Sequence, residues 1–189
     1  MQKIMMVMLL LLTGVSAFAL DFKTDKAHSK YGFTVTHLSI SEVDGKFKDH
    51  KAFWTLDEKG VLQSFEAEVQ TKSVDTDNVK RDKHLRNADF FEVEKYPVMT
   101  FKMQKHIGTK LVGELMIRGV KKQVVFDVKV SKVIQNPFSK DPQAKKVGVK
   151  LTTVINRKDF NVGSNYKNLT LSDEVEITVK LEGDSYIKK

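Results

Sequence analysis

The feature that most constrains this chain is an alternation of apolar and polar residues with a period of two, which recurs along most of its length after residue 29. The clearest case is the segment 174–182, where Val175, Ile177, Val179 and Leu181 alternate with charged or hydroxyl side chains. Because successive side chains of a strand point to opposite faces, this pattern predicts strands with one buried face. The predicted strands are 30–38, 43–47, 52–56, 64–72, 98–103, 111–117, 124–130, 147–155 and 174–182.

The composition supports a single globular domain with a hydrophobic core. The 189 residues are 41% apolar and 30% charged, which is typical of a folded chain of this length. The absence of cysteine excludes disulfides, thiolate nucleophiles, iron–sulfur clusters and cysteine-based zinc sites. The net charge is +8, but basic and acidic residues are interleaved, which indicates an ordinary solvated surface and argues against a nucleic-acid partner.

The first nineteen residues have the organisation of a secretory signal peptide. Lys3 precedes an unbroken apolar run over 4–12, and Ala17 and Ala19 place small residues at the positions that determine cleavage. This run is too short to cross a bilayer, which needs about 20 helical residues. We therefore expect residues 1–19 to be removed after Ala19, leaving one domain over 20–189 in the bacterial periplasm.

One segment, 75–87, is predicted to be helical, with Val79 and Leu85 on a short apolar face. A mostly antiparallel sheet of eight or nine strands must either pack as a sandwich or close, and closure removes exposed edges. We therefore predict an all-β fold: a closed antiparallel eight-stranded β-barrel with one short helix between strands. The interior of such a barrel holds either packed side chains or one small ligand.

Five ordered blocks carry a resemblance to a known family. They are His28-Ser29 followed by Phe33, Val35 and His37, then the segments 81–101, 113–124, 155–160 and 171–177. Together these blocks resemble the YceI-like family over essentially the whole of 20–189. The resemblance implies a periplasmic, lipocalin-like barrel whose interior binds polyisoprenoids or other long-chain amphiphiles.

The predicted ligand is therefore a long-chain isoprenoid, such as a polyprenyl phosphate or a quinone-like molecule, or another amphiphilic lipid. Apolar residues on the inward faces of the strands are the candidate pocket: Phe33, Val35, Phe65, Val69, Met99, Phe101, Phe126, Val128, Val149, Leu151 and Ile177. Polar residues that could meet a head group at the barrel mouth are His37, Arg81, His84, Arg86, Arg157 and Asp159. Structural ion pairs of the arginines, including a pair between Arg157 and Asp159, and a structural role for His37 remain open alternatives.

Two other classes of function also remain open. A barrel filled by its own side chains would be an interaction module, and His28 and His37 could meet Asp89 or Asp159 in a metal-dependent hydrolase. However, the chain has no HExxH, GxSxG, GxGxxG or Walker motif. We therefore predict a carrier or sequestering protein without catalytic residues, metal or cofactor, and leave open a transient membrane contact and a homodimer.

Overall fold

The computed structural model describes residues 19–187. The predicted signal peptide lies outside these residues except for Ala19. No helix in the described part of the chain is both long and apolar enough to cross a membrane. The helix is α1 (Val79–Leu85), and three 3₁₀ turns are η1 (Lys26–His28), η2 (Thr71–Ser73) and η3 (Arg157–Phe160). The strands are β1 (Leu20–Thr24), β2 (Lys30–His37), β3 (Ser41–Phe47), β4 (His50–Leu56), β5 (Leu62–Gln70), β6 (Val74–Asp75), β7 (Val98–Ile107), β8 (Lys110–Ile117), β9 (Val120–Val130), β10 (Ile134–Gln135), β11 (Lys145–Asn156) and β12 (Leu171–Ser185).

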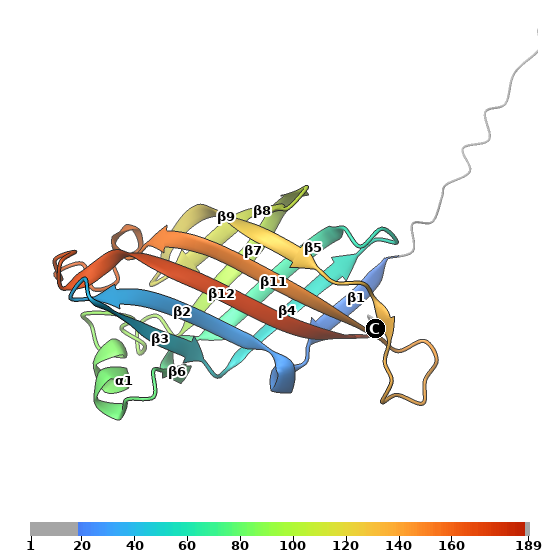
Figure 1. Cartoon of the computed structure of the whole chain (residues 1–189), viewed down its shortest axis with the longest axis horizontal. Coiled ribbons are helices and arrows are strands. Elements are labelled where there is room, and N and C mark those ends of the chain that lie inside the picture. Colours follow the sequence, from blue (N-terminus) through green and yellow to red (C-terminus); the bar gives the residue numbers. More distant parts are fainter. Residues whose placement is uncertain (1–18, 188–189) are drawn as a thin grey trace, which may run out of the picture.

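The sheet closes into an antiparallel barrel of eight strands, which confirms the predicted fold (Figure 1). Around the ring the order is β1, β4, β5, β7, β8, β9, β11 and β12, and β12 returns to β1. The β11–β12 pair closes the ring along its whole length, from Lys146↔Asp184 to Asn156↔Glu174. Closure leaves no long unpaired edge in the ring, which protects a sheet of this size from edge-to-edge association.

Three long strands of the barrel are each divided into two segments, which are β1 and β2, β3 and β4, and β5 and β6. β1 and β2 both pair with β12, at Gly183–Ser185 and at Leu171–Lys180 respectively. Likewise, β3 pairs with β2 and β4 pairs with β1, while η2 separates β5 from the short β6. The β2–β3 turn, α1 and the segment after η3 lie at the same end of the barrel, opposite the C-terminus (Figure 1). We call this end the mouth.

The predicted helix over 75–87 is wrong at both ends. Val74 and Asp75 pair with β3, and the helix begins only after Asn78, whose side chain accepts a hydrogen bond from the Arg81 amide at 3.0 Å. Such a side-chain cap fixes a helix N-terminus. Val79 is 86% exposed, so the predicted apolar face of the helix is reduced to Leu85, which packs against the core.

The nine predicted strands correspond to β2, β3, β4, β5, β7, β8, β9, β11 and β12. The prediction ends β7 too early and extends the segment 64–72 into the 3₁₀ turn at Thr71. It misses β1, because a five-residue strand offers only three positions on one face. That strand matters, since its pairing with both β4 and β12 completes the ring.

The end of the barrel opposite the mouth is filled by aromatic side chains. Trp54 stacks between Phe22 and Phe65, with ring centroids 5.9 and 6.0 Å apart, and all three side chains are almost completely buried. Gly183 faces the Trp54 ring, which leaves no room for a Cβ at that position. We call this region the closed end, and it supplies the solid part of the core.

Candidate ligand-binding cavity

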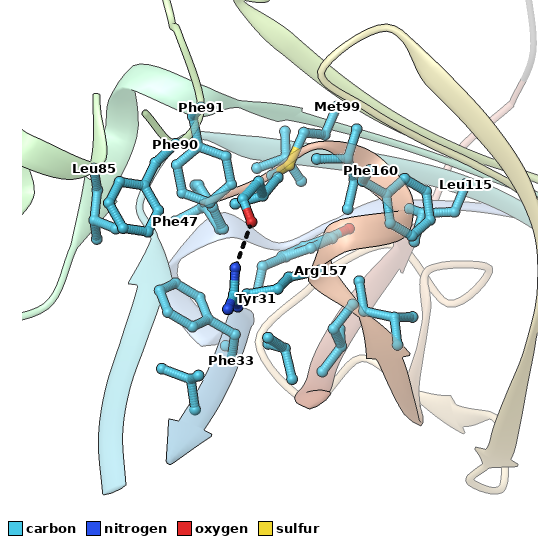
Figure 2. Close-up of a pocket in the computed structure, with 18 of the residues that line it drawn as sticks. Tyr31, Phe33, Phe47, Leu85, Phe90, Phe91, Met99, Leu115, Arg157 and Phe160 are labelled. Atoms are coloured by element: carbon cyan, nitrogen blue, oxygen red, sulfur yellow. Dashed lines mark hydrogen bonds between the residues drawn. The ribbon is translucent and has the colours of Figure 1, made fainter. Parts of the chain in front are cut away.

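The barrel interior between the closed end and the mouth contains a cavity of about 360 Å³. Its walls follow from the period-two pattern, because alternate residues of each strand point inward. On β2, for example, Tyr31, Phe33, Val35 and His37 all line the cavity. Figure 2 shows Phe33, Phe47, Phe90 and Phe91 gathered on one side of the pocket, with Met99, Leu115 and Phe160 on the other. The interior is therefore partly solid and partly hollow.

Two glycines allow aromatic rings to form the cavity wall. Gly45 on β3 lies opposite Phe33, and Gly113 on β8 lies against the ring of Phe101. A Cβ at either glycine would overlap the facing ring. Phe101 in turn meets Phe126 edge-on, with centroids 5.0 Å apart, which fixes its orientation. The missing side chains at these glycines thus set how far the rings project into the cavity.

The structure places nine of the eleven predicted apolar residues on the cavity wall: Phe33, Val35, Phe65, Val69, Met99, Phe101, Phe126, Leu151 and Ile177. Val128 and Val149 are buried but lie outside the cavity lining. The register pairs Val149 with Leu181 on β12, two residues from the Gly183 that faces Trp54, and this position belongs to the solid core. That these nine residues contact a ligand stays a prediction.

Several lining residues were not predicted, and some of them come from segments without strand periodicity. Leu85, Phe90 and Phe91 from α1 and the segment after it line the mouth side of the cavity. Phe47 meets Phe91 edge-on with centroids 5.5 Å apart, so this segment closes the wall next to β3. The sequence Asp89-Phe90-Phe91 offered a signal, because two adjacent phenylalanines beside a helix need a buried site. Further unpredicted lining residues are Tyr31, Val43, Phe160, Val162 and Tyr166.

Polar side chains in the lining are concentrated at the mouth. His84 Nε2 lies 3.2 Å from both the Asp89 carboxylate and the Tyr166 hydroxyl. The imidazole also meets the edge of Phe90, with centroids 5.1 Å apart. His37 ends β2 as an exposed residue of the lining. The mouth therefore adds the imidazoles of His37 and His84 and the Tyr166 phenol to the apolar wall of the cavity.

Arg81 lines the cavity and forms no direct ion pair within residues 19–187. Its Nε donates to the Thr76 hydroxyl and its Nη2 to the Thr76 carbonyl, both at 2.8 Å. The Thr76 hydroxyl donates in turn to the buried Asp82 carboxylate at 2.6 Å. Among the described residues no carboxylate lies within ion-pair distance of the Arg81 guanidinium. The scaffold holds Arg81 at the cavity while leaving Nη1 without a hydrogen-bond acceptor in residues 19–187.

Arg86 and Arg157, the other two arginines predicted to meet a head group, use their guanidinium groups within the protein. Arg86 donates to the carbonyls of Lys72 and Val74 at 2.9 and 2.7 Å, outside the cavity lining. Arg157 lines the cavity, yet its guanidinium donates to the carbonyls of Val162, Gly163, Tyr166, Leu171 and Ser172 and to the Asp173 carboxylate. With every N–H group used, Arg157 organises the mouth segment from within.

The predicted pair between Arg157 and Asp159 is wrong. Both residues belong to the 3₁₀ turn η3 instead of a strand, so their side chains do not share a face as residues two apart in a strand would. Arg157 pairs with Asp173 at 2.9 Å, and Asp159 is exposed and outside the cavity lining. Burial lowers the pKa of the Arg157 guanidinium, and the Asp173 charge partly opposes this effect.

The histidines considered for a hydrolase are not brought together. His28 precedes β2 and His37 ends it, so an eight-residue strand separates them. Within residues 19–187, the cluster with metal-ligand spacing is Asp25, His28 and Glu182. Lys146 already lies 3.0 Å from Asp25 and 3.6 Å from Glu182. Hydrogen bonds from His28 and then Lys146 lower the pKa of Asp25 to about 2, which identifies this group as an ion-pair cluster.

Comparison with known proteins agrees with this architecture. "Protein YceI" of Salmonella newport (strain SL254) is 36% identical over 181 residues, covering 92% of each chain, and that of Escherichia coli O157:H7 is 35% identical with the same coverage. A Campylobacter jejuni YceI crystal structure matches with a TM-score of 0.72 at 35% identity, covering 86% of this chain and 96% of the other.

A more distant structure, described as a polyisoprenoid binding domain from Saccharophagus degradans, shares the fold. Its TM-score is 0.66 at 16% identity, and the match covers 88% of this chain and 99% of that domain. The model of the YceI-like domain matches residues 22–183, which span the barrel from β1 to β12. The chain therefore belongs to the YceI-like family.

Proposed function

We propose that this protein binds one long-chain isoprenoid or similar amphiphilic lipid in the barrel, with the chain in the cavity and the head group at the mouth. The observation that carries this proposal is the cavity itself, apolar along its walls and polar at one end. Ligand sites are typically apolar concavities with a few placed polar groups. The family and the polyisoprenoid-binding description of the S. degradans domain support the same ligand class.

The cavity volume limits how much of the isoprenoid chain can contribute to affinity. At about 360 Å³ it lies near the lower end of the range of about 300 to 1,000 Å³ for small-molecule sites. At about 0.3 kcal/mol per buried heavy atom, each five-carbon isoprene unit contributes about 1.5 kcal/mol, or about tenfold in affinity. Affinity should therefore rise with each unit until the available space is filled.

The proposed role is transport or sequestration without covalent chemistry. Such a role requires a shielded apolar space and an entrance, both of which the barrel offers, and it requires no reactive group. Export to the periplasm, with cleavage after Ala19, belongs to the same proposal and is supported by the amino-terminal sequence. A carrier in that compartment would keep an apolar chain out of water between membranes.

Native mass spectrometry, followed by organic extraction of the purified protein, tests the proposal directly. We expect either a co-purified lipid or one-to-one uptake of added prenyl alcohols, with affinity rising with chain length. A protein recovered free of lipid that also fails to take up any prenyl alcohol would contradict the proposal. A metal-dependent increase in ester hydrolysis would favour the hydrolase alternative instead.

A further inference from the structure

Three large aliphatic side chains are exposed on two adjacent segments of the mouth. Leu38 and Ile40 belong to the β2–β3 turn and are 49% and 84% exposed, and Leu169, from the segment before β12, is 73% exposed. The two segments are joined by a hydrogen bond from the Leu38 amide to the Thr170 carbonyl at 3.0 Å. We call Leu38, Ile40 and Leu169 the rim. His37, Thr170 and Leu171, which flank the rim residues in sequence, line the cavity, so the rim borders its entrance.

The backbone of the turn gives an independent reason to look for a function. Leu38 and Ser39 both have positive φ, 52° and 58°, and the Ile40 amide donates to the His37 carbonyl at 3.2 Å. This is the geometry of a type I′ turn, where asparagine, aspartate and glycine are favoured. A leucine at such a position is conformationally unfavourable, and its exposure recovers little by burial. Neither the backbone conformation nor the burial of apolar surface therefore favours a leucine at position 38. This points to a contact that Leu38 makes outside the chain.

The charges near the rim identify the kind of surface that it fits. The segments 37–41 and 164–171 contain one cation, Lys167, and no carboxylate, and the carboxylate next to the turn is the exposed Glu42 on β3. At the same end of the barrel, α1 exposes Lys80 and Lys83, and its acidic residue, Asp82, is buried (Figure 1). Lys80, Lys83 and Lys167 form no ion pair with any residue in 19–187. Aliphatic side chains flanked by free lysines suit the surface of an anionic bilayer.

We propose that the rim docks this protein on an anionic lipid bilayer, with Leu38, Ile40 and Leu169 inserted among the lipids and the cavity entrance facing the membrane. The inference rests on the proposed function, because docking would let an apolar chain enter the barrel without crossing water. Lys167 and the lysines of α1 contribute attraction to lipid phosphates, and the three aliphatic side chains contribute apolar contact.

Sedimentation with vesicles of phosphatidylethanolamine and phosphatidylglycerol tests the docking. The full mature chain should bind these vesicles, and it should bind pure phosphatidylcholine vesicles more weakly. Its binding to the anionic vesicles should weaken as the salt concentration is raised. The triple variant Leu38→Ser, Ile40→Ser, Leu169→Ser should bind at least about tenfold more weakly, since it loses three exposed apolar contacts. Phe138→Ser is the matched control, because Phe138 is 90% exposed in the loop between β10 and β11, at the opposite end of the barrel.

The outcomes separate docking from lipid binding. Absence of vesicle binding by the unaltered protein would overturn the docking and would point to a protein partner for the rim. Equal binding by the unaltered protein and the triple variant would also overturn it. Uptake of a prenyl alcohol added in ethanol should be the same in both proteins, and only uptake from vesicles should fall in the variant. If neither protein takes up the alcohol while the variant still loses vesicle binding, the proposed function fails and the docking stands.

Discussion

The ring of Phe33 on β2 lies over Gly45 on β3, its directly paired residue, so that the backbone of one strand supports the cavity wall formed by the other. Gly45→Ala should therefore push the ring toward the cavity. Overpacking of this kind costs about 1–3 kcal/mol in folding free energy. We expect a larger effect on lipid uptake than on melting temperature, because the ring moves into the space that the ligand needs.

Gly148→Ala provides the matched control for this substitution. A Cβ at Gly148 would have ordinary contacts, the nearest being the Ser131 hydroxyl at 3.4 Å, and the residue lies outside the cavity lining. Calorimetry together with titration of a fluorescent prenyl analogue would separate stability from uptake. Equal uptake by the Gly45 and Gly148 variants would show that Phe33 does not limit the cavity.

The inner wall of the cavity offers a second prediction. Phe126→Asp places an unpaired carboxylate beside Phe101 and should abolish lipid uptake, whereas Arg86→Ala, outside the lining, should leave uptake unchanged. Since a buried charge can also unfold the barrel, circular dichroism must accompany the measurement. Val175→Phe, which fills the cavity with apolar atoms, should reduce uptake in a folded protein. Undiminished uptake in both cavity variants would remove the assigned pocket.

The strand residues of this wall could be predicted because periodicity reports which side chains point inward. Phe33, Phe101 and Phe126 follow from alternation alone. Closure of the sheet was predicted over a sandwich because it removes exposed edges. The same pattern is silent about the depth at which an inward side chain lies, so Val128 and Val149 were assigned to the pocket although they belong to the solid core.

The mouth was harder to predict because non-local contacts build it. Arg157 takes its acceptors from residues 162–173, and no spacing in the sequence reveals that five carbonyls turn toward one guanidinium. Phe90 and Phe91 contribute to the wall from a segment that is neither helix nor strand. Irregular segments have no period from which orientation can be read.

Arg157 should therefore behave as a structural residue. Arg157→Met would leave five carbonyls and Asp173 without their donor in a site where the arginine is 3% exposed, at a cost of about 3–5 kcal/mol in unfolding free energy. Urea denaturation measures this loss. A loss below about 1 kcal/mol would indicate that the mouth segment is held by its other contacts.

Arg81, in contrast to Arg157, should influence the preference of the protein for a phosphate over an alcohol head group. In Arg81→Gln, affinity for a prenyl phosphate should fall about 10- to 100-fold, the value of a charge-assisted hydrogen bond, while affinity for the corresponding prenyl alcohol changes little. Arg86→Gln is the matched control, because both of its bonds go to backbone carbonyls outside the cavity lining. Equal losses for phosphate and alcohol would assign Arg81 a structural role through Thr76.

His50 gives a prediction about pH and stability. Its ring is buried against Tyr31, with centroids 4.3 Å apart, and burial followed by the charge of Lys26 lowers the pKa of His50 below its usual 6.5. As the pH falls, His50 therefore becomes protonated at a higher pH in the unfolded chain than in the folded protein. Stability from this residue is fully present above pH 6.5 and is lost as the pH falls below that value.

His50→Phe keeps an aromatic ring against Tyr31 and removes the titration. As the pH falls below 6.5, the melting temperature of the variant should rise relative to that of the unaltered protein. His28 has a raised pKa through its hydrogen bond with Asp25 and contributes in the opposite direction, but it is present in both proteins and cancels in the difference. Asp25, with its pKa of about 2, has the same effect on both curves. A difference in melting temperature that does not change with pH would show that His50 titrates alike in the folded and unfolded chains.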